Sequence, residues 1–484
     1  MNALDLRPAL PALIVAVTAL VVLLVQAFAP KGKHGPYLEL SLFGLGAALA
    51  ATLLIASSQD RGRGGSLGGA LVADELALFL EALLLGVGVM AVLLTSSYLR
   101  ATGSERGEHY ALLLFSLVGM LGLVSVTELI ALFVALEIMS VALYALAGSR
   151  RDQLESQEAA IKYFITGAFS SAFLLYGVAM LYGVSGSTSL GRIGSAVVSA
   201  SGGSAGLALL GTGLLLVGFA FKVASVPFHM WTPDVYEGAP TTVTAFMAAG
   251  VKVAAFGALI RVFGTALAGL GDNWRPAIAI LAALSMVLGN LGALAQTNVK
   301  RMLAYSSVAH AGYLLAALTA APRVSAEAIL FYLVGYAAVN LGSFGALSAL
   351  ARSGREPLAL DHLSGLSSRR PALAAALTVF LISLTGVPVS AGFVGKFYLF
   401  SAAVGAGYTP LAIIGVLMSV VSAYYYLRVV VHMYMKEAPA MDEFGPVAAT
   451  SALALALSVV VVLGLGIWPA GVLGLAKAAA RSLL

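Results

Sequence analysis

Charged residues lie in the middle of long apolar stretches of this sequence, where they could bind a proton or another ion. Lys252 lies in TTVTAFMAAGVKVAAFGALI, Lys396 in SAGFVGKFYLF and Glu137 in TELIALFVALEIMSVALYALAG. A lysine at the centre of a membrane helix costs roughly 2.5–3.5 kcal/mol on insertion scales, so it normally faces the protein interior and has a partner there. The three residues are therefore candidates for moving protons. A purely structural hydrogen bond between helices is the alternative for each lysine.

Four further basic residues have stronger structural alternatives. Lys222 and His229, in FKVASVPFHMWTPDVYEGAP, lie close to a proline and to aromatic residues. Lys222 could extend to the membrane surface, and His229 could belong to an interfacial aromatic belt. Lys162 follows Glu158 by four residues, which is the spacing of a helical ion pair. His310, in AYSSVAHAGY, has hydroxyl neighbours and could be either a satisfied core residue or a proton relay.

A buried acid beside a buried lysine could act as a proton switch, and Glu137 is the natural counter-ion for Lys222. Burial favours the neutral form of a lysine, whereas a nearby carboxylate favours its charged form. At an effective dielectric constant of about 20, unit charges 4 Å apart interact by roughly 4 kcal/mol. This is enough to switch a lysine between binding and releasing a proton near neutral pH. Lys252 and Lys396 would then pass the proton on through water and hydroxyl groups.

The composition is that of a polytopic membrane protein. Of 484 residues, 60% are hydrophobic and only 10% are charged, and the mean hydropathy is +0.97; soluble proteins carry about 25% charged residues. The absence of cysteine excludes disulfides, thiolate metal sites and cysteine-held iron–sulfur clusters. Only His310 lies well inside an apolar segment, so no haem held by two histidines is expected. The sequence predicts no redox centre, metal or quinone site in this chain, and no nucleic-acid partner.

About 20 apolar residues span a bilayer, and this window predicts an all-α protein with fourteen transmembrane helices. The predicted segments are 9–29, 37–57, 70–98, 109–125, 128–148, 158–183, 205–226, 240–262, 276–295, 301–321, 325–351, 371–404, 408–435 and 445–471. The first, Leu10 to Phe28 at its core, is expected to be a retained helix and not a cleaved signal peptide.

Two of the predicted segments are expected to be interrupted. Segment 371–404 would be about 50 Å long as one helix and carries TGVPVSAG in its middle, and segment 205–226 ends in SVP. Interrupted helices are tolerated in membranes only where protein or a wet cavity satisfies the freed backbone groups. Two breaks five segments apart predict an internal repeat of five helices, inverted across the membrane, with ion sites at the breaks.

The loop charges predict the orientation of the chain. One side collects thirteen basic residues: Lys31, Lys33, Arg100, Arg106, Arg150, Arg151, Lys300, Arg301, Arg352, Arg355, Arg369, Arg370 and Lys436. The other side has nine: Arg7, Arg61, Arg63, Arg192, Arg261, Arg275, Arg323, Lys477 and Arg481. The positive-inside rule places the first group in the cytoplasm and both termini on the outer side of the membrane.

The chain closely resembles the antiporter-like membrane subunits of respiratory complex I, the bacterial NADH:quinone oxidoreductase. The resemblance covers nearly the whole chain and is carried by QEAAIKYFITGAFSSAFLLYG, FKVASVPFHMWTPDVYEGAP, VKRMLAYSSVAHAGY and SLTGVPVSAGFVGKFYLF. It implies fourteen helices, inverted repeats of helices 4–8 and 9–13, and broken helices 7 and 12. The implied divisions are an N-terminal three-helix segment (1–108), a first repeat (109–262), a second repeat (276–435) and a C-terminal helix (436–484).

The resemblance also implies roles for individual residues. The family's proton-carrying glutamate on helix 5 and lysines on helices 7, 8 and 12 match residues of this chain, as do its helix-6 lysine and its relay histidines. In that order the matching residues are Glu137, Lys222, Lys252, Lys396, Lys162, His229 and His310. The implied function is proton translocation coupled to quinone reduction elsewhere in the complex. NAD, FMN, iron–sulfur clusters and quinone would bind to partner subunits.

Other members of the family and other functions stay open as alternatives. By resemblance, the lysine at position 396 argues against M-type subunits and stand-alone D-type antiporters, which carry glutamate there, and the short C-terminal segment argues against an L-type subunit. The expected partners are M-like and K/J/A-like membrane subunits, the lateral helix of the L-type subunit, and membrane lipid. The main alternative is an Mrp-type or stand-alone cation/proton antiporter subunit. A membrane scaffold without ion traffic would have no need for the buried charges.

Overall fold

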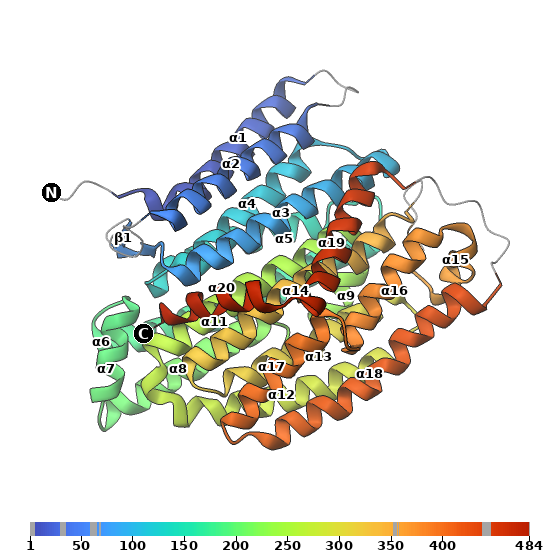
Figure 1. Cartoon of the computed structure of the whole chain (residues 1–484). Coiled ribbons are helices and arrows are strands. Elements are labelled where there is room, and N and C mark those ends of the chain that lie inside the picture. Colours follow the sequence, from blue (N-terminus) through green and yellow to red (C-terminus); the bar gives the residue numbers. More distant parts are fainter. Residues whose placement is uncertain are drawn as a thin grey trace.

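The computed structural model is a bundle of long helices that run roughly parallel to one another (Figure 1). It describes residues 5–29, 35–58, 65–66, 69–351, 356, 358–437 and 447–483. Twelve of the helices in these ranges are long and apolar enough to cross a membrane. The chain is therefore a multi-pass membrane protein, as its composition predicts.

The fourteen predicted segments all overlap helical structure. The first half of the chain forms η1 (Arg7–Ala9), α1 (Leu10–Phe28), α2 (Tyr37–Ser57), β1 (Gly65–Ser66), β2 (Leu71–Val72), α3 (Glu75–Thr102), α4 (Gly107–Ser125), α5 (Leu129–Ala147), α6 (Leu154–Ser185), α7 (Leu190–Ser199), α8 (Gly203–Lys222), α9 (Trp231–Gly238), α10 (Thr241–Phe246), η3 (Met247–Val251), α11 (Lys252–Arg261) and η4 (Val262–Ala266). The second half forms η5 (Ala268–Leu270), α12 (Gly271–Leu294), α13 (Val299–Leu318), α14 (Pro322–Ser348), η6 (Leu360–Leu363), α15 (Leu366–Arg369), α16 (Pro371–Thr385), α17 (Ala391–Gly405), α18 (Thr409–Met435), α19 (Ala449–Ile467) and α20 (Ala470–Arg481). Strands β1 and β2 pair antiparallel, with Gly65 opposite Val72.

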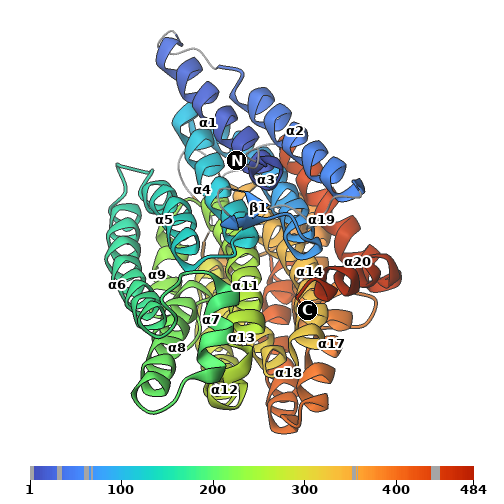
Figure 2. The ribbon, with the colours of Figure 1, turned by 90° about the vertical axis from the view of Figure 1, so that its left-hand side faces the viewer.

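The centre of the bundle is formed by α14 and by the continuous helical stretch Thr241–Ala266, which consists of α10, η3, α11 and η4. Helices α1 and α2 lie at one edge of the bundle, and α12 and α18 at the opposite edge (Figure 2). Small residues allow close approach to the central stretch: a β-carbon at Gly257 would lie 2.7 Å from the Leu80 side chain of α3. Glycine at such a contact is typical of helix packing in membranes.

The first predicted break follows Lys222, where α8 ends and residues 223–230 form turns. Ala224 has a φ of +60°, a left-handed conformation that no helix continues through. The backbone groups that the break frees have side-chain partners. The Phe221 carbonyl accepts a hydrogen bond from Trp231 Nε1 at 3.3 Å, and the Val226 N–H donates to Ser285 Oγ of α12 at 2.9 Å. These two backbone groups are thus hydrogen-bonded inside the protein, as the interior of a membrane requires.

The second predicted break lies between α16 and α17. Gly386 and Val389 have φ values of +92° and +70°, so the chain turns out of the helix within TGVPVSAG. Ser390 restarts the helix, because its side chain caps α17 by accepting a hydrogen bond from the Phe393 N–H at 3.5 Å. The prediction of an interrupted segment is therefore confirmed here as well.

The structure differs from the sequence analysis at two residues that were counted as loop bases. Arg261 is 5% exposed in the last turn of α11, where it forms a bidentate ion pair with Asp74 at 2.6 and 2.8 Å. Lys300 is 0% exposed in the first turn of α13. Lys300 was counted on the predicted cytoplasmic side and Arg261 on the opposite side. Removing both from the count therefore leaves the excess of basic residues on the cytoplasmic side unchanged. Lys31, Lys33, Arg61, Arg63, Arg352 and Arg355 lie outside the described residues.

Candidate functional site

Lys252 lies in the most buried helix of the bundle and is itself 2% exposed. Its ammonium group donates a hydrogen bond to the backbone carbonyl of Ser307 on α13 and lies 5.3 Å from the centre of the Tyr336 ring on α14. The residues just before it form the π-helical turn η3, a local widening of the helix that is frequent at functional sites. Lys252 therefore has polar partners on two neighbouring helices and no access to the surface.

His310 lies next to this lysine in a shell of tyrosines. It is 1% exposed, its Nδ1 pairs with the Tyr332 hydroxyl, and its Nε2 lies 3.3 Å from the Tyr426 hydroxyl. Tyr426 in turn pairs with Ser306 one helical turn away from the histidine. An imidazole with a hydroxyl at each nitrogen can accept a proton on one side and release it on the other.

The tyrosines connect Lys252 with Lys396. The Ser307 hydroxyl lies 2.9 Å from that of Tyr336, whose ring centre is 5.6 Å from the His310 ring. On the other side, the Tyr313 ring is 5.2 Å from His310. The charges of both lysines act on His310. We refer to these residues as the central polar cluster: Lys252, Ser307, His310, Tyr313, Tyr332, Tyr336, Lys396 and Tyr426.

Lys396 forms the far end of the central polar cluster, at the break between α16 and α17. Its ammonium group is 4.8 Å from the centre of the Tyr313 ring. It donates to the carbonyls of Leu384 and Thr385 at 2.9 and 3.0 Å and to Ser419 Oγ at 3.1 Å. These carbonyls end α16, where the helix dipole favours a cation. A groove of about 840 Å³ between α17 and α18 reaches the lysine.

Lys222 and Glu137 lie at the other helix break and are not in direct contact. Lys222 is 3% exposed, so it does not extend to the surface, and its ammonium group donates to Ser140 Oγ at 2.8 Å. Glu137, one turn before Ser140 on α5, accepts a hydrogen bond from Ser171 Oγ at 2.5 Å. Among the described residues no ion pair within 4.0 Å joins the two charges, although the Glu137 charge acts on Lys222. The Lys222 ammonium group and the Glu137 carboxyl therefore each have a serine hydroxyl as partner.

His229 lies in the turns after the first break and is half-buried. Burial lowers its pKa, and its ring centre is 6.5 Å from that of Tyr305. Within the part of the chain that the structure describes, no hydrogen bond or ring contact joins it to Lys222, Lys252 or Lys396. The structure thus does not bring His229 into the central polar cluster.

Lys162 lies in a network of ion pairs at the surface. Its ammonium group is 2.6 Å from Glu158 and 2.6 Å from Asp234, and the side chain is 41% exposed. Asp234 also pairs with Arg301 at 2.7 Å, and although its partial burial raises the pKa of this carboxyl, both cations lower it overall. The predicted helical ion pair with Glu158 is confirmed, but Lys162 is separate from the central polar cluster.

Lys162→Ala is therefore expected to have a much smaller effect than removal of a lysine in the central polar cluster. Exposed ion pairs contribute about 0–1 kcal/mol to stability, and Arg301 still pairs with Asp234 when Lys162 is absent. If the chain moves protons as its resemblance to complex I subunits implies, the variant should retain at least half of the electron-transfer and proton-pumping rates, measured in membranes that contain the assembled complex. Loss of more than nine-tenths of either rate would mean that protons pass through this surface network.

A buried ion cluster at the start of α10 was missed by the sequence analysis. Glu356 pairs with Lys300 at 3.0 Å and with Arg150 at 3.3 Å, and it accepts hydrogen bonds from the Tyr98 hydroxyl at 2.8 Å and the Thr241 N–H at 3.1 Å. Burial raises the pKa of this carboxyl, but the two cations outweigh it and hold the pKa at about 2. Nothing in the sequence around this glutamate distinguishes it from a solvated loop acid.

Glu81 was also missed, although the sequence carries a signal for it. It is a single acid within LALFLEALLLG on α3, and its side chain is 2% exposed. The same argument from the cost of a buried charge that selected Glu137 applies to it.

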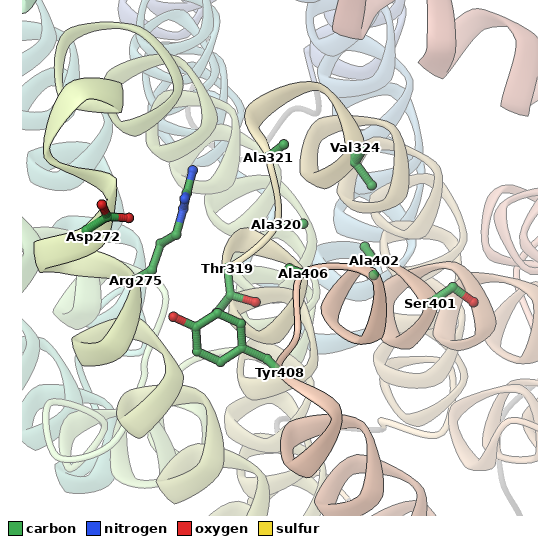
Figure 3. Close-up of a pocket in the computed structure, with 11 residues that line it drawn as sticks. Asp272, Arg275, Thr319, Ala320, Ala321, Val324, Ser401, Ala402, Ala406 and Tyr408 are labelled. Carbon is green, nitrogen blue, oxygen red and sulfur yellow. The ribbon is translucent and has the colours of Figure 1, made fainter.

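A surface pocket of about 480 Å³ lies where α12 begins and α17 ends (Figure 3). Its lining includes Asp272 and Arg275 of α12, Thr319 after α13, and Tyr408. None of the predicted proton-carrying residues lines it. The central polar cluster, and not this pocket, is therefore the candidate site.

The fold and the buried groups define a class: a polytopic membrane protein in which lysines are held at helix breaks inside the bundle. The chain belongs to the NADH:quinone oxidoreductase/Mrp antiporter transmembrane family, whose model matches residues 126–422. It is 44% identical to an NADH-quinone oxidoreductase subunit N of Trichlorobacter lovleyi, over 99% of this chain and 97% of that protein.

Two solved structures extend the comparison. A chain of respiratory complex I from Thermus thermophilus with bound aureothin is 38% identical, with a TM-score of 0.81, over 96% of this chain and 98% of that one. A chain of the Mrp complex from Dietzia sp. has a TM-score of 0.85 over 99% and 98% of the two chains, but it is only 24% identical. The second likeness shows the fold alone.

Proposed function

We propose that this chain is the N-type proton-translocating membrane subunit of a bacterial NADH:quinone oxidoreductase. The observation that carries the proposal is that Lys252, His310 and Lys396 form one continuous polar cluster in the interior of the bundle. The chain that holds it is 44% identical to a protein named as subunit N. Electron transfer would take place in partner subunits, which would bind NAD, FMN, iron–sulfur clusters and quinone.

Protons would pass along the buried groups in the order Glu137, Lys222, Lys252, His310 and Lys396. Glu137 sets the charge state of Lys222 through Ser140 and the intervening electrostatic field. Lys252 exchanges its proton with water and hydroxyls around Ser307 and Tyr336, since its only hydrogen-bond partner in the described residues is a carbonyl. Lys162 and His229, which lie outside the central polar cluster, would have only an accessory part in this route.

We also propose how many times the chain crosses the membrane and how its helices divide into repeats. Adding α13 and the broken pair α16–α17 to the twelve long apolar helices gives fourteen crossings. The inverted repeats would span 109–262 and 276–435, flanked by 1–108 and 436–484. In support, each repeat holds one break with a left-handed non-glycine residue, Ala224 or Val389. A lysine accompanies each break: Lys222 is the last residue of α8, and the ammonium group of Lys396 binds the carbonyls that end α16. Both termini would face the periplasm of the inner membrane.

The partners follow from the same assignment. The chain would sit among M-like and K/J/A-like membrane subunits, against the lateral helix of the L-type subunit and lipid. Two surfaces leave room for such contacts: the groove beside Lys396 and the exposed apolar face of α18. An Mrp-type or stand-alone antiporter subunit is the second candidate, favoured only by the shared fold.

Changing the cation of the assay buffer distinguishes the two candidate functions. Inverted membrane vesicles that contain the assembled complex would be energised with NADH in choline, sodium or potassium chloride, with a strain lacking this chain as control. We expect proton uptake that requires the chain and differs by less than about 20% between the three salts. Proton movement that depends several-fold on sodium or potassium would instead support the antiporter and overturn the proposed function.

A further inference from the structure

Glu81 is a buried acid that the proposed proton route does not use. It lies on α3, six residues after the first residue of the helix, or about 9 Å along its axis. The residue is 2% exposed, and its carboxyl group lies against hydroxyls of α2 and α4. It also lies outside residues 126–422, which the family model matches.

The hydrogen bonds around Glu81 leave few donors for an ionised carboxylate. Ser125 Oγ of α4 lies 2.7 Å from one carboxyl oxygen, and Thr52 Oγ1 of α2 lies 3.5 Å from the other. Each hydroxyl has a single hydrogen, and each also lies within hydrogen-bond distance of a helix carbonyl, that of Leu121 at 3.0 Å or Ala48 at 3.1 Å. An ionised carboxylate accepts at about four positions and donates at none.

No cation among the described residues lies within ion-pair distance of Glu81. The charged groups that act on it are Asp74 of the same helix and Arg261 from the end of α11, and these two are paired with each other. Helices α2 and α4, which supply the two hydroxyls, place no charged group that acts on it. A carboxyl that holds its own proton can donate it to Ser125 or Thr52 and satisfies this site without a cation.

An ion pair lies near Ser125, at the end of the bundle where α3 begins. Ser125 follows Val124, whose carbonyl accepts a hydrogen bond from Arg261 Nη2 at 3.1 Å. Arg261 holds Asp74 at 2.6 Å, and the Asp74 side chain is 14% exposed. The Asp74–Arg261 pair thus lies beside the backbone that carries Ser125, and Arg261 is on the helix that carries Lys252 nine residues earlier.

We propose that Glu81 is an additional proton-binding carboxyl of this chain, which exchanges its proton with the membrane face through Ser125 and the Asp74–Arg261 pair. The proton leaves a Glu81 oxygen for the Ser125 hydroxyl, whose own proton moves to water beside Asp74. No other bond changes. The part of this exchange in proton translocation rests on the proposed function, whereas the presence of the bound proton does not.

Infrared spectroscopy of the full chain tests the bound proton. The chain would be purified with ¹³C-carboxyl-labelled glutamate, and the spectrum of Glu81→Gln subtracted from that of the wild type at pH 7. Glutamine keeps the shape and hydrogen-bonding capacity of the side chain but cannot gain or lose a proton. We expect the difference to contain the carbonyl band of a protonated carboxyl. Carboxylate bands in its place would overturn the proposal.

Variants that lack one buried hydroxyl group test the proton exchange of Glu81 in the assembled complex. Glu81→Gln and Ser125→Ala should each lower NADH-driven proton pumping two-fold or more. Ser41→Ala removes another fully buried hydroxyl, which donates to the Tyr37 carbonyl of α2 at 2.7 Å, and should leave pumping unchanged. Equal effects of the Ser125 and Ser41 variants would mean that Ser125 does not carry the exchange. Normal pumping in Glu81→Gln would overturn the exchange even if the infrared band is present. If Lys252 itself proved dispensable, the proposed function would fail but the infrared result would stand.

Discussion

In Lys252→Ala, electron transfer from NADH to quinone and proton pumping are expected to fall together by roughly tenfold or more, with the complex still assembled. Loss of one positioned proton-transfer group typically lowers a rate by 10²–10⁴-fold, and Lys252 is the only charged residue of the stretch Thr241–Leu259 in the centre of the bundle. The two rates should fall together because a blocked proton path stops the redox chemistry to which it is coupled. Both rates would be measured side by side in membranes.

Two control variants separate this result from a packing defect. Lys252→Met keeps an unbranched side chain of similar length without the charge, and it should lose both rates like the alanine variant. Val253→Ala removes apolar atoms from the next residue, which is 0% exposed, and should retain most of both rates at a stability cost of about 1–3 kcal/mol. Normal rates in Lys252→Ala would make the lysine structural, and the proton path would lose its central residue.

The helices and their breaks could be predicted because their causes are local. Membrane helices need about 20 apolar residues, and this requirement alone located α4, α5 and α18 to within about two residues. The second break was predictable because TGVPVSAG cannot continue an α-helix, and the structure turns there at Gly386 and Val389. The way in which the freed carbonyls are satisfied could not be predicted, because one of their partners is the Lys396 side chain eleven residues later.

The buried charges could be predicted one by one, but their contacts could not. His310 meets tyrosines from α14 and α18 that lie 22 and 116 residues away, and no sequence pattern determines which side chains meet over such separations. The same limit applies to Lys222 and Glu137, because Lys222 meets Ser140 from 82 residues away in the sequence and Glu137 meets Ser171 from 34 residues away. Lys300 resembled a loop base because a buried lysine at a helix start is distinguishable only by its distant partner, Glu356.

Glu356→Ala is expected to have the largest effect on stability. The side chain is 4% exposed and is the shared partner of Lys300 and Arg150, which are 0% and 15% exposed. Removal of one partner of a buried ion pair destabilises a protein by about 3–5 kcal/mol, because a buried charge is left uncompensated. The same carboxylate holds the Thr241 N–H at the start of the helix that carries Lys252. The thermal unfolding midpoint of the purified chain should fall, and less assembled complex should be found in membranes.

The pH dependence of this stability has a defined sign. The pKa of Glu356 is about 2 in the folded chain, below its ordinary value of 4.5. A lowered folded pKa means that the ion cluster stabilises the chain fully above about pH 4.5 and loses this contribution as the pH falls towards 2. The wild-type unfolding midpoint should therefore fall through this range more steeply than that of Glu356→Gln. As a control, Glu327→Ala breaks the more exposed pair with Arg323, which is worth about 0–1 kcal/mol. Equal midpoints for Glu327→Ala and Glu356→Ala at pH 7 would show that the buried cluster does not stabilise the start of the Lys252 helix.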